Sequence, residues 1–412
     1  MFNDFNIPNY VKYVLNGIEQ SGFNAYLVGG CVRDRLMGLV PKDWDITTNA
    51  LPEQIMEIFP NCVPTGLKHG TVTIVLPDKN TIEVTTFRID GKYLDSRRPE
   101  NVYFSKNLYE DLSRRDFTMN AIAWSLKEGI VDPFDGRGDI ENKIIRCVGE
   151  APKRFSEDAL RMMRAIRFAA VLNFELHPDI PSAILNLHHL LKNISAERVR
   201  EEFSKTLLSD NPEKIYLYKS LELTQYFLPE CANIQDDDLK NILAHIHGIS
   251  VSVHDRLAYL LYNFTDDISS VMNRLKYDNK TCYKVKSIAQ CLKIRVPENA
   301  YEMRLMMSDK LLRNGIKDSL NIRKEVMDQE EKPSIIYALE LYDQTLKLNH
   351  CTEISMLAVN GNDLENLGIK DGKEKGRLLK KLLDATLVDP SLNIYESLVN
   401  ILHRDYNYTS PD

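Results

Sequence analysis

The amino-acid sequence changes character near residue 145, and this change constrains the fold more than any other feature. Before it, short segments such as 71–76 and 81–88 alternate apolar and polar residues, as half-buried strands do. From Ser156 onward, almost every segment shows the three-to-four-residue spacing of amphipathic helices, interrupted at prolines. The sequence therefore predicts an α+β chain, with an α/β head followed by an extended all-helical region.

The first part of the head predicts a strand, a tight turn and a helix in succession. Residues 26–28 form a short apolar run that leads into Gly29-Gly30, and 32–37 is typical of a helix. A second strand is expected at 45–47. Further elements are expected at 51–59 (a helix with proline at its start), 71–76 and 81–88 (strands), and 77–80 (a turn).

The composition favours a folded protein in a reducing cytoplasm. Hydrophobic residues make up 43% and charged residues 27% of the 412 residues. The chain has no secretory signal and no apolar stretch near the ~20 residues of a membrane-spanning helix, so no membrane partner is expected. The seven cysteines contain no Cys-x-x-Cys pair, which indicates neither a disulfide framework nor a zinc site.

The net charge of −7 argues against non-specific binding to long nucleic-acid duplexes. It does not exclude a local, shaped site for RNA, because a basic patch can bind phosphates whatever the total charge.

Asp43 and Asp45 are the strongest candidates for metal ligands. They stand two residues apart at a strand, so their side chains point to the same face. Such a pair can hold two divalent cations ~4 Å apart for phosphoryl transfer, and Mg²⁺ is the natural ion for a few carboxylates plus substrate phosphates. Glu83, on a neighbouring predicted strand, is a third catalytic candidate. The alternative is a solvated strand end.

The Gly29-Gly30 turn is a candidate phosphate site. It places unpaired backbone N–H groups at a helix start, where an anion such as a triphosphate is favoured. Arg33, in the first turn of that helix, can add a charged contact. A plain turn without a ligand is the alternative.

A second motif, Arg114-Arg115-Asp116, suits a nucleotide as well. The two arginines match phosphates, whereas Asp116 and Asn120 can bind ribose hydroxyls. A helix start with a solvated arginine pair explains the same residues equally well.

A third motif begins after Ser156, which is expected to be the N-cap of a helix. Asp158 and Arg161 then stand three residues apart and are predicted to be neighbours on that helix. A carboxylate acceptor beside a guanidinium donor complements the pairing edges of cytosine and adenine and mismatches uracil and guanine, so the protein itself can act as template. Arg164 and Arg167 continue the basic edge toward phosphates. A surface ion pair is the alternative.

At this point the chain resembles the class II tRNA nucleotidyltransferases (CCA-adding enzymes) and the related bacterial poly(A) polymerases. The resemblance rests on GGCVRD with KDWD, RRDFTMNA and EDALRMMRAIRF, in that order. It implies a head (1–145), a neck that recognises the base (146–208), a body (209–300) and a tail that binds tRNA (301–412). It also implies template-independent addition of C, C and A to tRNA from CTP and ATP.

The resemblance assigns roles residue by residue. It makes Asp43 and Asp45 the metal ligands, Asp116 a ribose contact, and Asp158 and Arg161 the base-reading pair. The nucleotide-contacting positions that it implies are Gly30, Arg33, Arg115, Arg164 and Arg167.

The segment from Ile89 to Pro99 resembles the flexible loop of this family. If Arg97 and Arg98 help the site to close around the last nucleotide, shortening residues 90–99 is expected to spare C addition and to cripple A addition. Incorporation of single nucleotides into tRNA measures both, and an equal loss of the two would contradict the prediction.

The body departs from many relatives, which carry a His-Asp phosphohydrolase signature at the end of an apolar helix. Here 257–261 ends in Tyr262-Asn263, which do not supply the same ligands. His254-Asp255 precedes that helix, and Asp255 is expected at its start, so no second active site is predicted. In the tail, 370–377 is locally basic and suits a phosphate backbone, although a solvated loop is as good a reading.

The sequence thus predicts a Mg²⁺-dependent, CCA-adding tRNA nucleotidyltransferase with tRNA, ATP and CTP as partners. An A-adding enzyme and a poly(A) polymerase are the close alternatives, and a non-catalytic RNA-binding protein is the remote one. The absence of a long basic C-terminal extension favours tRNA over arbitrary RNA. The sequence leaves open whether the protein is a monomer or a homodimer.

Overall fold

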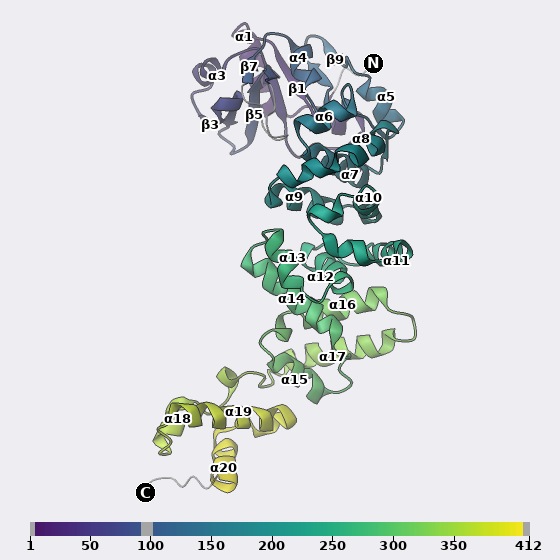
Figure 1. Ribbon diagram of the computed structural model, residues 1–412. Coiled ribbons are helices and arrows are strands. Elements are labelled where there is room, and N and C mark those ends of the chain that lie inside the picture. Colours follow the sequence, from purple (N-terminus) through teal and green to yellow (C-terminus); the bar gives the residue numbers. More distant parts are fainter. Residues whose placement is uncertain (1–4, 92–101, 407–412) are drawn as a thin grey trace. The chain divides into compact units, whose positions relative to one another are not determined.

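The computed structural model describes residues 5–91 and 102–406, and its elements are labelled in Figure 1. The chain divides into two compact units, Met1–Asn233 and Ile234–Asp412. Within the described residues all strands belong to the first unit, whereas the second is helical. This arrangement confirms the predicted α+β class. The finer division into four domains stays a prediction.

The first unit is built on a mixed sheet that has seven strands among the described residues, in the order β3-β4-β5-β2-β1-β8-β9. β2 and β5 run parallel, and the other neighbours are antiparallel. The strands of this sheet are β1 (Ala25–Val28), β2 (Asp45–Thr48), β3 (Cys62–Gly66), β4 (Thr71–Val75), β5 (Thr81–Thr86), β8 (Ala123–Ser125) and β9 (Gly129–Val131). Two small sheets pair β6 (Arg88–Asp90) with β7 (Val102–Phe104) and β10 (Ile144–Ile145) with β11 (Glu175–Leu176).

The helices of the first unit differ in how much of their surface is buried: α7 (Leu160–Leu172) is buried on most sides, whereas α1 (Asn9–Gln20) buries a single apolar face. In α1 the buried residues recur every three to four positions, which directs a single stripe toward the interior. The helices are α1 (Asn9–Gln20), α2 (Gly30–Leu36), α3 (Pro52–Ile58), α4 (Leu108–Ser113), α5 (Gly136–Glu141), α6 (Ala151–Glu157), α7 (Leu160–Leu172), α8 (Asp179–Leu187), α9 (Ala196–Leu207) and α10 (Tyr216–Ser220).

The predicted elements of the head are confirmed, with ends that agree to within two residues. The burial pattern of β5 shows why the sequence predicts these strands. Ile82 and Val84 are buried and Glu83 between them is exposed, as a strand with one covered face requires. Proline at the first position of α3 likewise marks the helix start that the sequence indicates.

The predicted helix start at Ser156 is wrong. Ser156 lies inside α6, and its hydroxyl donates to the carbonyl of Pro152 at 2.8 Å. The chain between α6 and α7 is extended at Asp158 (φ −138°, ψ 105°). The N-cap position of α7 is Ala159, and the carboxylate of Asp158 accepts a hydrogen bond from the amide of Leu160, the first residue of the helix, at 3.1 Å.

Apolar clusters among the described residues of the second unit include one around α15–α17 and one around α18–α20. No helix in the described part of the chain is long and apolar enough to cross a membrane. The helices are α11 (Asp236–Ile246), α12 (Val253–Phe264), α13 (Ile268–Arg274), α14 (Asn279–Lys293), α15 (Ala300–Ser308), α16 (Ile316–Val326), α17 (Lys332–Lys347), α18 (Gly361–Asn366), α19 (Gly372–Val388) and α20 (Tyr395–Tyr406).

The structure bears on two predictions about the second unit, the helix start at Asp255 and the basic segment 370–377. Asp255 lies in the first turn of α12, as expected for a residue near a helix start. The basic segment 370–377 mostly forms the beginning of α19, where Asp371 caps the helix and Lys375 pairs with Glu365 at 2.6 Å. Its contact with RNA stays a prediction.

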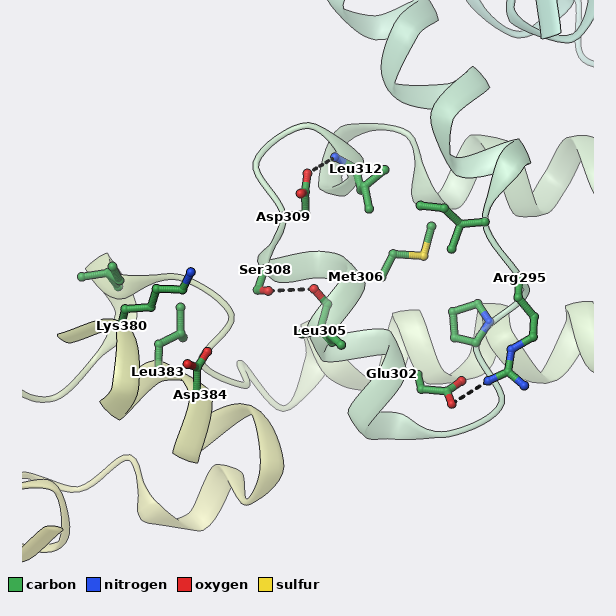
Figure 2. A pocket seen from close by; sticks show the side chains of 13 residues that line it. Arg295, Glu302, Leu305, Met306, Ser308, Asp309, Leu312, Lys380, Leu383 and Asp384 are labelled. Carbon is green, nitrogen blue, oxygen red and sulfur yellow. Dashed lines mark hydrogen bonds and ion pairs between the residues drawn. The ribbon is translucent and has the colours of Figure 1, made fainter. Parts of the chain in front are cut away.

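A cavity of about 900 Å³ lies within the second unit. Figure 2 shows Leu305 and Met306 of α15 and Leu383 of α19 on its wall, together with the ion pair of Arg295 and Glu302 at 2.9 Å. All residues predicted for the active site belong to the first unit, so this cavity is not part of that site.

Candidate active site

The Gly-Gly turn follows the end of β1 and the Asp-x-Asp pair lies at the start of β2, so both lie at the same end of these two inner strands. The two strands are antiparallel with Leu27 opposite Ile46, so the turn that follows β1 lies beside Asp45. Gly29 has φ 78° and ψ −134°, a conformation that residues with a side chain rarely adopt. A Cβ there would also come within 3.2 Å of Nη1 of Arg115. Both constraints require glycine.

Asp45 lies at the centre of an accumulation of negative charge. β2 and β5 pair in parallel with Asp45 opposite Glu83. Burial raises the pKa of Asp45 to about 6, the charges of Glu83 and Asp43 act in the same direction, and Arg115 opposes them. Carboxylates that repel one another in this way favour a bound cation.

The predicted metal fits this donor set. No three His, Cys, Asp or Glu side chains within residues 5–91 and 102–406 are grouped so that they hold a metal by themselves. Magnesium does not need such a group, because it commonly binds through one or two carboxylates and takes its remaining ligands from water and substrate phosphates. Asp43 and Asp45 would supply two carboxylates, and their role as metal ligands, like that of Glu83 as a catalytic residue, stays a prediction.

Asp111 anchors the two arginines of the second motif. Its carboxylate is fully buried, and Oδ1 accepts Nε and Nη2 of Arg114 at 3.0 and 2.7 Å. Its Oδ2 accepts Nη2 of Arg115 at 3.1 Å. Burial by itself raises the pKa of Asp111, but the charges of Arg115 and Arg114 outweigh burial and the pKa is lowered. Asp111 is therefore an ionised carboxylate that fixes both guanidinium groups.

A row of hydrogen bonds connects three of the motifs. Nη1 of Arg33 donates to Oδ1 of Asn120 at 2.7 Å, and Nδ2 of Asn120 donates to Oδ1 of Asp116 at 3.1 Å. Oδ2 of Asp116 accepts Nε and Nη2 of Arg164 at 2.8 and 2.6 Å. Burial by itself raises the pKa of Asp116, but the charges of Arg164 and Arg161 outweigh burial and lower it. Asp116 thus positions Arg164, while its contact with ribose stays a prediction.

The ring of Phe168 packs against three arginine side chains of the predicted site. The guanidinium carbon of Arg167 lies 3.5 Å from the ring centroid, and those of Arg33 and Arg164 lie at 5.2 and 5.3 Å. Nε of Arg167 also donates to the buried carboxylate of Glu202 at 2.8 Å. Stacking on a ring and an ion pair fix long side chains that would otherwise sample many rotamers.

Asp158 and Arg161 are held by different partners, so the alternative of a surface ion pair between them is not what the structure shows, and the prediction that they are neighbours on one helix is wrong. Oδ2 of Asp158 accepts Nη2 of Arg198 at 2.9 Å. Arg161 is only 9% exposed; its Nη1 donates to Glu157 at 2.8 Å and its Nη2 to the carbonyl of Arg114 at 2.9 Å. The break between α6 and α7 explains the difference, because the two residues do not share a continuous helix.

Comparisons with known proteins cover most of the chain. Residues 25–146 match the family model of the poly A polymerase head domain. Residues 173–235 match a probable RNA- and SrmB-binding site of polymerase A, and residues 252–402 match a putative second domain of tRNA nucleotidyltransferases.

The CCA-adding enzyme of Lactobacillus delbrueckii subsp. bulgaricus is 37% identical over 383 residues, which is 91% of this chain and 92% of that protein. The chain belongs to the CCA-adding enzyme family. The enzyme of Geobacillus stearothermophilus is 54% identical over 194 residues, or 47% of this chain and 48% of that protein. Members of this family are tRNA nucleotidyltransferases, and this chain is therefore one too.

The structural similarity is equally extensive. The crystal structure of the Bacillus stearothermophilus CCA-adding enzyme in complex with CTP has a TM-score of 0.81 and 32% identity, and the match covers 96% of this chain and 97% of that one. This neighbour confirms that the head and the helical region together form the fold of a CCA-adding enzyme.

The sequence motifs do not assign a role to four residues that contact the predicted site residues: Asp111, Phe168, Arg198 and Glu202. Two of them left a signal in the sequence. Asp111 precedes the arginine pair by three and four positions, the spacing of charged neighbours on a helix. Glu202 is a charged residue on the apolar face of a helix, next to Phe203. Arg198 left none, because its partner Asp158 is distant in the chain. Phe168 lies within the third motif, one and four positions after Arg167 and Arg164, but an aromatic residue in a helix is by itself no sign of stacked arginines.

Glu202→Ala is expected to lower the free energy of unfolding by about 3 kcal/mol, because it leaves the nearly buried guanidinium of Arg167 without its anion. Urea denaturation followed by circular dichroism measures the loss. Glu201→Ala, at an exposed position on the same helix, is the matched control and should change little. Equal effects of the two substitutions would contradict a stabilising role for the ion pair.

The family's flexible loop lies largely outside the described residues. Arg97 and Arg98 fall within residues 92–101, so their predicted role in A addition stays a prediction.

Proposed function

We propose that this chain adds C, C and A in turn to the 3′ end of tRNA, with CTP and ATP as substrates and without a nucleic-acid template. The observation that supports this most directly is the convergence of Asp43 and Asp45 with the Gly29-Gly30 turn and Arg115 at one end of the inner strands β1 and β2. The reaction would be an in-line attack of the RNA 3′-hydroxyl on the nucleotide α-phosphate, with release of pyrophosphate.

Asp43 and Asp45 would hold two Mg²⁺ ions together with the substrate phosphates. When bound, these ions would favour loss of the proton from the 3′-hydroxyl and neutralise charge on the departing pyrophosphate. Asp45 must be ionised to act as a ligand, and because its pKa is raised in the metal-free protein, a cation that binds there competes with a proton.

The phosphates of the incoming nucleotide would lie between the Gly-Gly turn and Arg115. The Nε of Arg115 is buried and, among the described residues, has no hydrogen-bond partner. A buried donor without a partner costs free energy unless a ligand binds it, which supports an anion at this place. Arg33, Arg164 and Arg167 surround Phe168 nearby and would supply further contacts to the nucleotide.

Asp158 and Arg161 would read the base. Each is fixed by its own partners and not by the other, so both can present hydrogen-bonding groups to a base without first breaking a mutual ion pair. A site that is organised before the ligand binds discriminates better, because less free energy is spent on ordering side chains.

Nucleotide incorporation by the purified protein with Mg²⁺ tests the proposal. The substrates are tRNAs that end before CCA, after C and after CC, each with a single nucleoside triphosphate. C addition to the first two and one A on the third, with UTP and GTP rejected, is the expected result. A addition only after CC would make the protein an A-adding enzyme, long A tracts on any RNA would make it a poly(A) polymerase, and no incorporation would contradict an enzyme.

A further inference from the structure

We infer that Asp111 is a positioning residue for nucleotide binding: it holds Arg115 so that the free side of the guanidinium group faces the triphosphate. The inference rests on the proposed role of Arg115 in binding phosphates. It assigns a function to a carboxylate that belongs neither to the metal pair nor to the base-reading pair.

The contacts of Asp111 divide its two arginines into different roles. Arg114 donates two hydrogen bonds to one oxygen of the carboxylate, whereas Arg115 donates only one, from Nη2. Arg115 therefore keeps Nε and Nη1 for a ligand, and Nε has no partner among the described residues. The two guanidinium groups share the single carboxylate of Asp111, and Arg115 also attracts the carboxylate of Asp45.

Asp111 also connects Arg115 to the strand that carries the metal pair. The hydroxyl of Thr47 lies 3.3 Å from Oδ2 of Asp111, the oxygen that accepts a hydrogen bond from Arg115, and 3.1 Å from the carbonyl oxygen of Thr85, so its one proton is shared between the two acceptors. Thr47 follows Asp45 by two residues on β2, so the two side chains point to the same face of the sheet. The strand that positions Asp45 thus also fixes the anchor of Arg115.

The position of Arg115 explains why an anchor is needed. A Cβ atom added to Gly29 would lie 3.2 Å from Nη1 of Arg115. Arg115 is therefore next to the Gly29-Gly30 turn, the predicted binding site of the phosphates. An unattached arginine side chain would lose rotamer entropy when a nucleotide binds, whereas one that is already fixed loses little. Loss of the Asp111 carboxylate is therefore expected to weaken phosphate binding without removing any group that contacts the nucleotide.

The test compares the binding of CTP with that of cytidine, which lacks phosphates, to the full-length protein by equilibrium dialysis. Arg115→Ala tests the proposed function first and should weaken CTP binding by roughly thirtyfold. Asp111→Asn should weaken it by about tenfold and leave cytidine binding nearly unchanged. In the Arg115→Ala background, Asp111→Asn should have no further effect, because the two residues act through one contact.

Asp139→Asn is the matched control. Asp139 is also buried in the first unit, and its carboxylate accepts hydrogen bonds from Thr118 and Arg146. It has no contact with Arg115. Its substitution should leave CTP binding unchanged, even if thermal unfolding shows a loss of stability. If Asp111→Asn does not fold, Thr47→Val removes only the hydroxyl at Oδ2 and should weaken CTP binding by about threefold.

The outcomes separate the two proposals. If Arg115→Ala does not weaken CTP binding, the proposed role of Arg115 is wrong, and the inference falls with it. If Arg115→Ala weakens CTP binding but Asp111→Asn does not, only the inference is wrong. Multiplicative losses in the double variant, or an equal loss of cytidine binding, would make Asp111 a residue of packing alone.

Discussion

Asp45→Asn is expected to abolish nucleotide incorporation and, at the same time, to stabilise the metal-free protein at neutral pH. Incorporation of CTP into tRNA should fall by roughly a thousandfold or more, because asparagine cannot supply the anionic ligand that a hard divalent cation requires. The fold should persist, since the carboxylate of Asp45 contributes no stabilising ion pair among the residues that the structure describes.

The stability effect follows from the direction of the pKa shift. The pKa of Asp45 is raised in the folded protein from 3.8 to about 6, so the folded state binds the proton more tightly than the unfolded state. Stability is therefore lost as the pH rises from about 4 to about 6, and it stays lower above that range. Asparagine avoids this loss and should raise the free energy of unfolding by about 2 kcal/mol near neutral pH.

Urea denaturation in the presence of a chelator, near pH 8 and near pH 4, measures the difference between Asp45→Asn and the native protein. The difference should be present at the higher pH and small at the lower one. Glu53→Gln, at an exposed position on α3, is the control and should show neither effect. Retained incorporation, or a loss of stability near pH 8, would contradict the metal-site assignment.

Arg161→Ala is expected to remove the selectivity between nucleotides while leaving the chemistry in place. A site built to hydrogen-bond one pairing edge rejects the wrong base by roughly a thousandfold or more, and truncation of the donor should reduce the discrimination between CTP and UTP to about tenfold. The substitution does not leave an anion unpaired, because Glu157 keeps its ion pair with Arg154 at 2.9 Å.

The measurement is kcat/KM for CTP and for UTP on tRNA that ends before CCA. Lys153→Ala, at an exposed position on α6, is the matched control and should retain full discrimination. If Arg161→Ala lowers kcat/KM for both nucleotides by the same factor, the residue does not read the base.

The head of the molecule could be predicted from the sequence because its signals are local. The strand before Gly29-Gly30, the turn itself and the helix after it each leave a mark within a few residues, and glycine is required there by a positive φ. The Asp-x-Asp spacing is equally local, but strand alternation applies only to Asp45, because β2 begins there and Asp43 lies in the bend that precedes it.

The region around Asp158 could not be predicted because tertiary contacts decide its conformation. The helical spacing continues from α6 into α7, so the pattern gives no sign of the break between them. Asp158 lies outside both helices, where it accepts a hydrogen bond from the amide of Leu160 and binds Arg198 of α9, which stands forty positions further along the chain. The partners of Arg167 and Asp116 are hidden in the same way, because Glu202 and Arg164 become their neighbours only when α7, α9 and the head pack together.

The most direct test of the account is to sequence the 3′ ends of a tRNA that lacks CCA after incubation with the purified protein, Mg²⁺ and all four nucleoside triphosphates together. The account predicts that C, C and A are added in that order and that extension then stops, although UTP and GTP are present. Incorporation of U or G, extended A tracts or unextended tRNA would contradict it.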